Sequence, residues 1–409
     1  MRSRLVIAAV ALLAAGCGSA PSSPATSASG GQTSATVPAT VTPTAPASSA
    51  PSASAQAGQA CAGTPPSQLV VGDFGTDALT YVQFVSASQG WVVGRRQILA
   101  TTDGGATWTV QDQGDLNLVS GDFISSTTGW AVGVHTLLFT DNGGSTWTRL
   151  PEPCPALQSV HFVSASVGFA VAGGSGAQGT GTTAPGTGGV VLTTTDGGRS
   201  WHALPAPANP QTICFSSPDS GWLGADGKLY ASSDGGYSWK LRARGVHGGG
   251  LSPGFMAVQC ANGSAWAEEI GPGAGMSQEP HVGFHADPAG VTPIFAEQYF
   301  PHPGVTISIE SPSAYAGPMS AISASAAAFV DWCDACGYGT VPWDLATSDG
   351  QQLTQEGNVA DINEASSASF LSPYLGWVIG IVVNGTHPIQ RIVRTEDGGR
   401  TWQVQYSAG

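Results

Sequence analysis

The chain has 409 residues and a formal net charge of −14 at pH 7, and only 13 of its residues are lysine or arginine. This balance argues against nucleic acid as a partner, because phosphates are bound by clustered basic side chains. It also argues against electrostatic binding to anionic lipid headgroups, and the length is ample for a large hydrophobic core.

Residues 1–16 have the features of an export signal, here a lipoprotein signal peptide. Arg2 and Arg4 precede an apolar run over residues 5–15 that is too short to span a membrane. The stretch LLAAGC at residues 12–17 resembles a bacterial lipobox, and this resemblance implies that Cys17 is lipidated and becomes the new N-terminus. The alternative interpretation is an ordinary cleaved signal in which the cysteine stands by chance.

Residues 17–66 are predicted to form a disordered tether. Between residues 18 and 60 the sequence contains only Gly, Ser, Ala, Pro, Thr, Gln and Val. Such a segment cannot bury enough apolar surface to offset its chain entropy, and as a flexible coil it would reach roughly 35–40 Å. The lipid and tether would hold residues 67–409 at the outer face of the cytoplasmic membrane. The Ala-, Gly-, Pro- and Thr-rich composition favours an actinobacterial source.

Two motifs recur through residues 67–409 in a constant order. The first runs from Phe to an aromatic residue seven positions later, in the copies FVSASQGW (84–91), FISSTTGW (123–130), FVSASVGF (162–169), FSSPDSGW (215–222) and FLSPYLGW (370–377). The second, which we call the box, follows as TTDGGATW (101–108), TDNGGSTW (140–147), TTDGGRSW (194–201), SSDGGYSW (232–239) and TEDGGRTW (395–402). Five copies indicate architecture, because a catalytic motif usually occurs once.

Each unit predicts four antiparallel strands, because short β-branched and aromatic runs alternate with Gly-rich turns. Four strands repeating at about forty residues are typical of a propeller blade. Two degenerate units, at residues 255–295 and 322–354, bring the five clear units to seven. We therefore predict an all-β protein, a β-propeller of seven four-stranded blades, with six or eight blades as alternatives. Residues 68–74 would add a closing strand whose place stays open.

The box has the chemistry of a tight turn. Its carboxylate can accept backbone N–H groups, its glycines can adopt positive φ, and its tryptophan can wedge against a neighbouring blade. The pattern resembles the Asp-box (BNR) motif of sialidase-like and sortilin-like propellers, where such turns lie on the face away from the usual binding site. The resemblance implies structural roles for Asp103, Trp108, Asn142, Trp147, Asp196, Trp201, Asp234, Trp239, Asp397 and Trp402.

The two motifs together look most like the photosystem II assembly and stability factor family, over about five blades. This resemblance implies a scaffold or assembly role, without a cofactor. Two features depart from the pattern: Asn142 replaces the box aspartate, and the arginine-rich binding surface of those relatives has no match in this arginine-poor chain.

Four of the six cysteines that follow the lipobox are assigned to disulfides, as an exported chain favours. Cys214 and Cys260 fall at similar points in the innermost strands of successive units, so we hypothesise that they pair. By elimination, Cys61 would pair with Cys154.

The stretch CDAC at residues 333–336 holds the remaining two cysteines, Cys333 and Cys336. An intraloop disulfide, or two bonds to cysteines elsewhere, is the preferred interpretation. A zinc site would need a second ligand pair at comparable spacing, which the sequence lacks. We therefore expect no metal here.

The face opposite the boxes would be built by the other loops, and propellers generally bind partners through such loops. The candidate binding residues are Arg95, Arg96, His135, Arg242, Arg244, His247, Tyr338 and His387. For any single one of them, the alternative is an ordinary solvated loop residue.

No convergent catalytic set emerges from the sequence. GLSPG at residues 250–254 fits G-x-S-x-G, but a strand rather than a helix follows it. We expect a non-catalytic, lipid-anchored cell-surface propeller that binds an envelope protein or a glycan. The alternative is a sialidase-like glycoside hydrolase, which would share the boxes; its F/Y-R-I-P motif is missing near the start, and QRIVR at 390–394 is the nearest echo.

Overall fold

A computed structural model describes most of the chain after residue 77. The chain divides into two units, Met1–Ser49 and Ala50–Gly409, and every strand named below lies in the second. The described residues are 61, 78–173, 189–244, 254–271, 281–297, 310–311, 316–331, 341–348, 353–384 and 387–408. Cys17 and the predicted closing strand at residues 68–74 lie outside them. The described residues contain no helix, and hence none that is long and apolar enough to cross a membrane.

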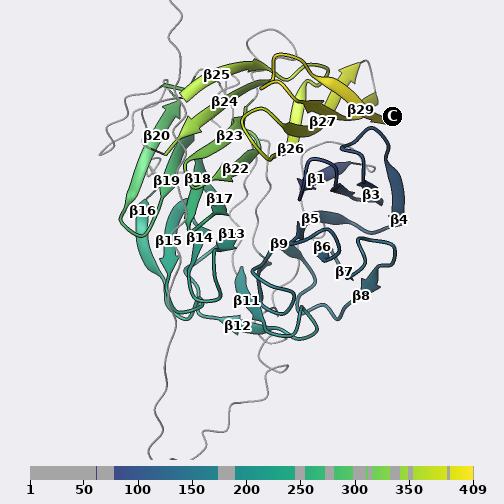
Figure 1. The fold of residues 1–409 in the computed structure, drawn as a ribbon. Helices are drawn as coiled ribbons and strands as arrows, with labels where there is room; N and C mark the ends of the chain where they lie inside the picture. Colours follow the sequence, from purple (N-terminus) through teal and green to yellow (C-terminus); the bar gives the residue numbers. More distant parts are fainter. Residues whose placement is uncertain are drawn as a thin grey trace, which may run out of the picture. The chain divides into compact units, whose positions relative to one another are not determined.

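The strands form seven antiparallel sheets that follow one another along the chain, each made of consecutive strands (Figure 1). Blade 1 consists of β1 (Leu79–Phe84), β2 (Gly90–Gly94), β3 (Gln97–Thr101) and β4 (Thr109–Gln113). Blade 2 consists of β5 (Leu118–Phe123), β6 (Gly129–Gly133), β7 (Thr136–Thr140) and β8 (Thr148–Arg149). Blade 3 consists of β9 (Leu157–Phe162), β10 (Gly168–Ala172), β11 (Val190–Thr194) and β12 (His202–Leu204). Blade 4 consists of β13 (Pro210–Phe215), β14 (Gly221–Ala225), β15 (Lys228–Ser232) and β16 (Lys240–Arg244).

The two degenerate units form blades 5 and 6, as predicted. Blade 5 consists of β17 (Phe255–Ala261), β18 (Ser264–Ile270), β19 (His281–Ala286) and β20 (Val291–Glu297), with β21 (Glu310–Ser311) added in parallel at its edge. Blade 6 consists of β22 (Met319–Ser323), β23 (Ala326–Val330), β24 (Pro342–Thr347) and β25 (Leu353–Asn358). Blade 7 consists of β26 (Glu364–Phe370), β27 (Gly376–Asn384), β28 (His387–Thr395) and β29 (Gln403–Ala408).

The first strands of the seven blades make a closed ring. Each of β1, β5, β9, β13, β17, β22 and β26 contacts the next one in this order, and β26 contacts β1 (Figure 1). Among the described residues, no blade takes a strand from another part of the chain, so the ring closes by packing between blades. The predicted seven-bladed β-propeller is confirmed.

The spacing of the first motif follows from contacts within and between blades. Phe123 stands opposite Gly129 in the β5–β6 ladder, and a Cβ atom on that glycine would lie 2.3 Å from the Phe123 ring. Trp91 of blade 1 stacks on the other side of this ring, with centroids 4.3 Å apart, and the box tryptophan Trp147 meets it edge-on at 6.1 Å. In each clear copy, the phenylalanine ring is therefore packed between an aromatic ring of the preceding blade and the glycine opposite it in its own blade. We call this arrangement an aromatic sandwich, and it requires glycine because a Cβ atom would clash with the ring.

Four other interfaces repeat this sandwich. The rings stack between Trp377 and Phe84, Trp130 and Phe162, Phe169 and Phe215, and Trp343 and Phe370. Box tryptophans lie at the interfaces: Trp201, for example, packs in one apolar cluster with Trp130 and Leu150 of the preceding blade. The motif residues thus join each blade to its neighbour.

Candidate functional site

A central channel runs between the seven first strands, all of which contribute to its wall. Its volume is about 370 Å³, within the range of small-molecule sites, about 300–1,000 Å³. The wall is rich in serine, threonine and glutamine side chains, and the described lining residues include no lysine or arginine. Asp122 is the only carboxylate among these lining residues, and His161 is the only histidine.

A ring of side-chain links surrounds this channel, one at each interface between blades. In four of the five clear copies, the residue just before the motif phenylalanine bonds the main chain of the phenylalanine in the next blade. Gln83, for example, accepts the N–H of Phe123 at 2.8 Å and donates to its carbonyl oxygen at 3.1 Å. The linked pairs are Gln83 with Phe123, Asp122 with Phe162, His161 with Phe215, Cys214 with Cys260, Gln259 with Ala321, Ser320 with Phe370 and Ser369 with Phe84.

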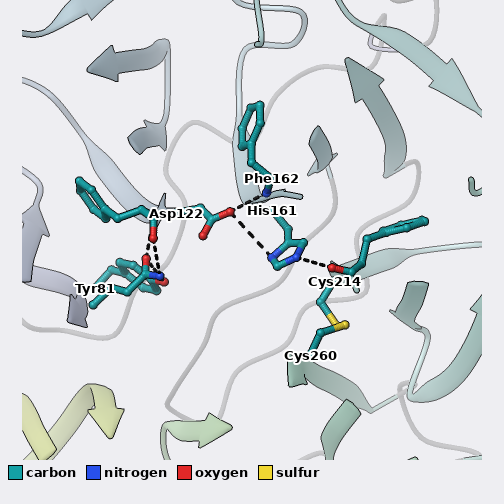
Figure 2. Close-up of polar contacts among 9 residues, drawn as sticks. Tyr81, Asp122, His161, Phe162, Cys214 and Cys260 are labelled. Carbon is teal, nitrogen blue, oxygen red and sulfur yellow. Dashed lines mark hydrogen bonds and ion pairs between the residues drawn. A yellow bond between two sulfur atoms is a disulfide. The ribbon is translucent and has the colours of Figure 1, made fainter. Parts of the chain in front are cut away.

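The disulfide Cys214–Cys260 occupies the place of one link, between blades 4 and 5, with Cα atoms 5.6 Å apart (Figure 2). Its position shows that Cys260 stands where the clear copies have phenylalanine. The second hypothesised disulfide, Cys61–Cys154, is also present, with a Cα–Cα distance of 5.5 Å. Both pairings agree with the sequence hypothesis.

Asp122 and His161 form the links at two successive interfaces, and their side chains lie next to each other in the channel wall (Figure 2). His161 Nε2 lies 2.7 Å from the Phe215 carbonyl oxygen, which can only accept, so Nε2 carries the hydrogen. His161 Nδ1 lies 3.8 Å from Asp122 Oδ2, which also accepts the N–H of Phe162 at 2.5 Å. The 3.8 Å separation is too long for a hydrogen bond, so the contact between the imidazole and the carboxylate is electrostatic.

Burial raises the pKa of Asp122, while the neighbouring His161 and the Phe162 N–H oppose that rise. Burial also raises the pKa of Tyr81, and the charge of Asp122 adds to the effect. The Tyr81 hydroxyl donates to Gln83 Oε1 at 3.1 Å, so it stays protonated within the same polar cluster. The cluster can hold a proton near the channel, but its groups are also parts of the blade links.

The boxes form the turns between the third and fourth strands, and their polar groups bond within each turn. Asp103 Oδ1 accepts the N–H of Thr107 at 2.8 Å, and Oδ2 accepts its hydroxyl at 2.6 Å. The hydroxyl of Thr107, its N–H and the hydroxyl of Thr101 lower the pKa of Asp103 to about 2. Gly104 and Gly105 have φ values of 74° and 96°, which the turn requires and which suit glycine.

Asn142 makes the same turn without a charge. Its Oδ1 accepts the N–H of Thr146 at 3.0 Å, and its Nδ2 donates to the Thr146 hydroxyl at 2.8 Å. Asp196, Asp234 and Asp397 repeat the aspartate pattern with Ser200, Ser238 and Thr401. The geometry thus gives these side chains turn-forming partners, in line with the structural role that the resemblance implies.

Of the predicted binding residues, Arg95, Arg96 and His135 lie in turns between second and third strands, at the ends of blades opposite the boxes. Arg96 Nη1 lies 3.1 Å from Asp115 Oδ1, and His135 Nδ1 lies 3.6 Å from Glu152 Oε2. These contacts join the turns to the connections that lead into the next blade. The side chains of Arg96, Asp115 and His135 are exposed, so the contacts contribute little to stability and stay open to a partner.

The predicted position of Arg242 needs correction. The sequence places it on the face opposite the boxes, whereas its guanidinium donates to the carbonyl oxygens of Asp287 and Pro288, at 3.4 and 3.3 Å. These residues form the β19–β20 turn, which occupies the box position of blade 5. Arg242 lies within β16 rather than in a connection, and it also lies 5.7 Å from the Trp222 ring, so it joins blades 4 and 5.

For several of the predicted binding and disulfide residues, the side chain lies outside the described part of the structure. Arg244 ends β16 and is exposed. His387 begins β28, but its side chain lies outside the described part of the structure, as do His247, Tyr338, Cys333 and Cys336. Within the described ranges, no group of three His, Cys, Asp or Glu side chains is arranged to hold a metal ion.

Sequence reasoning missed the ring of links, although a signal for it exists. The residues directly before the motif phenylalanines are Gln83, Asp122, His161, Cys214 and Ser369, each able to bond sideways to a neighbouring strand. Of these five residues, only Cys214 was assigned a role from the sequence, as a disulfide cysteine. Comparing the same position in all copies would have indicated a shared role.

The fold and its turns define a class: a seven-bladed β-propeller built from Asp-box (BNR) repeats. Residues 72–205 and 117–250 match the family described as photosynthesis system II assembly factor YCF48. The resemblance inferred from the motifs is confirmed by this match. Among curated proteins, no relative with significant sequence similarity was found.

Solved structures of low sequence identity are similar to this chain, two of them with a TM-score above 0.5. YCF48 from Cyanidioschyzon merolae is 17% identical over 70% of this chain and 84% of that chain, with a TM-score of 0.46. The GH74 enzyme of Niastella koreensis is 11% identical over 82% of this chain and 67% of its own, with a TM-score of 0.52. A chain of a mitotic checkpoint complex is 10% identical over 85% and 96%, with a TM-score of 0.52. Likeness at these identities concerns the propeller fold alone.

Proposed function

We propose that the chain is an exported lipoprotein, anchored through Cys17, whose propeller is a non-catalytic scaffold for an envelope protein or a glycan. The partner binds the face opposite the boxes, where Arg96, His135 and Arg244 lie. The lipid is the only attachment to the membrane, at the outer face of the cytoplasmic membrane. The family match over residues 72–250 supports an assembly role, since the family is described as an assembly factor.

The observation that carries this proposal is the structural use of the box aspartates and of Asp122. The box aspartates bond within their own turns, and Asp122 bonds the main chain of Phe162. Retaining and inverting glycosidases need two carboxyl groups, about 5–9.5 Å apart, on either side of the scissile bond. Among the residues that line the described channel, Asp122 has no such carboxylate partner.

Two further observations support export. The lipobox-like stretch and the uncharged segment behind it suit an anchored protein. The disulfides Cys61–Cys154 and Cys214–Cys260 suit an oxidising compartment, because thiols inside most cells are kept reduced.

The proposal is tested by chemical cross-linking of the full-length protein in its own membranes, followed by mass spectrometry. A Cys17→Ser variant is the matched control, because it removes the lipid acceptor and leaves the propeller sequence intact. We expect membrane attachment to require Cys17, and one envelope component to be captured reproducibly by the anchored protein. An anchored, well-recovered bait that captures no component would contradict the scaffold.

The hydrolase alternative has a separate readout. Purified protein is incubated with chromogenic glycosides and sialosides, with an Asp122→Asn variant beside it. We expect no release of chromophore by either protein. Turnover by the wild type that disappears in the variant would show that the protein is a glycosidase and not a non-catalytic scaffold.

A further inference from the structure

Seven turns in the described structure contain an asparagine or aspartate followed directly by glycine. The pairs begin at Asp103, Asn142, Asp196, Asp226, Asp234, Asn262 and Asp397. Such a pair is chemically labile, because the nitrogen of glycine can attack the side-chain carbonyl carbon before it with no side chain in the way. Hydrogen bonds that hold either group oppose this attack, so the partners of each pair decide where it occurs.

In six of the seven pairs, both groups are held. In the pair at Asn142, Oδ1 accepts the N–H of Thr146 at 3.0 Å, and the Gly143 N–H donates to the carbonyl oxygen of Thr127 at 2.8 Å. In the other five pairs the side chain is also hydrogen-bonded, and the following glycine also donates its N–H. These five pairs begin at Asp103, Asp196, Asp226, Asp234 and Asp397.

The pair Asn262 and Gly263 is the exception. These two residues form the turn between β17 and β18, which the cross-strand pair Ala261 and Ser264 closes. Both turn residues are exposed and have positive φ, 49° and 88°, and no atom lies within 4 Å of a Cβ atom built on Gly263. In the described structure, neither the Asn262 amide nor the Gly263 N–H has a hydrogen-bond partner. Both groups are therefore free to approach each other when this short exposed turn opens locally, which costs little.

We propose that Asn262 is a site of spontaneous deamidation. The Gly263 nitrogen loses its proton to a base from solvent and attacks Asn262 Cγ, so that a new N–C bond closes a five-membered succinimide ring. The Cγ–Nδ2 bond breaks, and Nδ2 takes up a proton and leaves as ammonia. Water then opens the ring at either of its carbonyl groups, which gives aspartate or isoaspartate and requires no oxidant or cofactor.

The modification changes the charge of blade 5. Either product places a carboxylate in the β17–β18 turn, and isoaspartate also lengthens the main chain there. Residues 245–390 contain no lysine or arginine, so the new charge adds to a stretch that has no basic side chain besides histidine. The proposal is independent of the scaffold function, and either can fail without the other.

Incubation of the purified protein at mildly alkaline pH, followed by peptide mapping with mass spectrometry, tests the site. A synthetic peptide with the sequence of residues 258–266 gives the rate of the same pair without the fold. We expect Asn262 to be converted at least about tenfold faster than Asn142, because Asn142 must first lose its turn bonds. Asn262→Gly, which suits the positive φ of the turn, should abolish the product at this position.

Thr146→Ala is the matched control for protection, because it removes the hydroxyl that accepts from Asn142 Nδ2 at 2.8 Å. In a folded protein it should speed the reaction at Asn142 and leave the rate at Asn262 unchanged. An Asn262 that stays intact while the peptide reacts would overturn the site. Equal rates at Asn262 and Asn142 in the wild type would contradict it too, because the turn bonds would then not decide where the reaction occurs.

Discussion

Asp103 illustrates how a carboxylate can be structural while remaining exposed. Its two oxygens bond the N–H and hydroxyl of Thr107, and the turn glycines beside it adopt φ values that other residues rarely reach. Asn142 performs the same task in blade 2 with an amide. The chain thus contains its own comparison between a charged and a neutral box.

That comparison yields a prediction. Asp103→Ala should lower the melting temperature by a few degrees, because two turn bonds to Thr107 are lost. Asp103→Asn should lower it less, because an amide makes both bonds in the Asn142 box. Thermal unfolding followed by circular dichroism measures both. Loss of partner capture by Asp103→Ala at an unchanged melting temperature would show that the box has a binding role instead.

The pH dependence of the boxes has a definite sign. Hydrogen bonds from Thr107 lower the pKa of Asp103 to about 2, and hydroxyl bonds also lower the pKa of Asp234 and Asp397. Groups with a lowered folded-state pKa stabilise the protein above their unfolded pKa, about 3.9, and this contribution is lost as the pH falls toward 2. We expect the melting temperature to fall between about pH 4 and pH 2. A melting temperature that stays constant across this range would contradict the assignment.

Asp122 should behave in the opposite way, because burial raises its pKa. Its ionisation in the folded state opposes folding, so stability is lost as the pH rises from the unfolded pKa through the raised value. Asp122→Asn keeps an acceptor for the Phe162 N–H and should remove this loss. Asp122→Ala leaves that N–H unbonded and should cost about 1–3 kcal/mol. Urea unfolding at several pH values checks both variants, and the account fails if Asn destabilises as much as Ala near neutral pH.

At the scale of the strands and turns, the first motif specifies how blades meet. The motif phenylalanine needs a glycine opposite it, an aromatic ring from the preceding blade above it, and a box tryptophan at its edge. The phenylalanine and its glycine stand six positions apart in every clear copy, and the two aromatic partners recur in the same order along the chain. The order of strands and turns could therefore be predicted from the repeat alone.

The glycine requirement gives a prediction with a control in the same protein. A Cβ atom at Gly129 would lie 2.3 Å from the Phe123 ring, so Gly129→Ala should cost about 1–3 kcal/mol through overpacking. Gly290, in the β19–β20 turn, has no atom within 4 Å of such a Cβ and no positive φ, so Gly290→Ala should be nearly neutral. Chemical denaturation of the two variants provides the comparison. Equal losses in both would show that the sandwich does not explain the motif.

The sequence predicted the blades, the boxes and the two disulfides because each is encoded in a repeated or singular residue pattern. It could not predict that the amide of Gln211 is bonded while that of Gln158 is not, because the two residues look alike in the repeat and differ only in their contacts. Arg242 was misplaced for a similar reason. Its strand position is encoded locally, whereas the direction of its guanidinium depends on the turn of the next blade.

At the scale of the whole propeller, closure depends on interfaces rather than on a shared strand in the described residues. Seven side-chain links, at one level around the channel, hold the blades together. Only the link between blades 4 and 5 is covalent. Opening any of the five interfaces that hold stacked rings would expose those rings, so the links and the aromatic sandwiches support one another there.

Removal of the covalent link is therefore expected to weaken the ring. Cys214→Ala with Cys260→Ala should reduce the free energy of unfolding by about 2–4 kcal/mol, the usual contribution of a disulfide. The paired control removes Cys61 and Cys154, which lie outside the set of channel links. Hydrogen exchange followed by mass spectrometry should show faster exchange in β13 and β17 only for the first pair. Equal exchange in both pairs would mean that the link has no local role.

Site-specific photo-cross-linking in native membranes tests the scaffold most directly. A photoreactive residue replaces Arg96 or Arg244, on the face opposite the boxes, and in a parallel strain Thr127, in an exposed turn on the box face. The account predicts one envelope component that cross-links from Arg96 or Arg244 and not from Thr127. The same component captured from Thr127 alone, by a protein that remains anchored and folded, would contradict it and assign partner binding to the boxes.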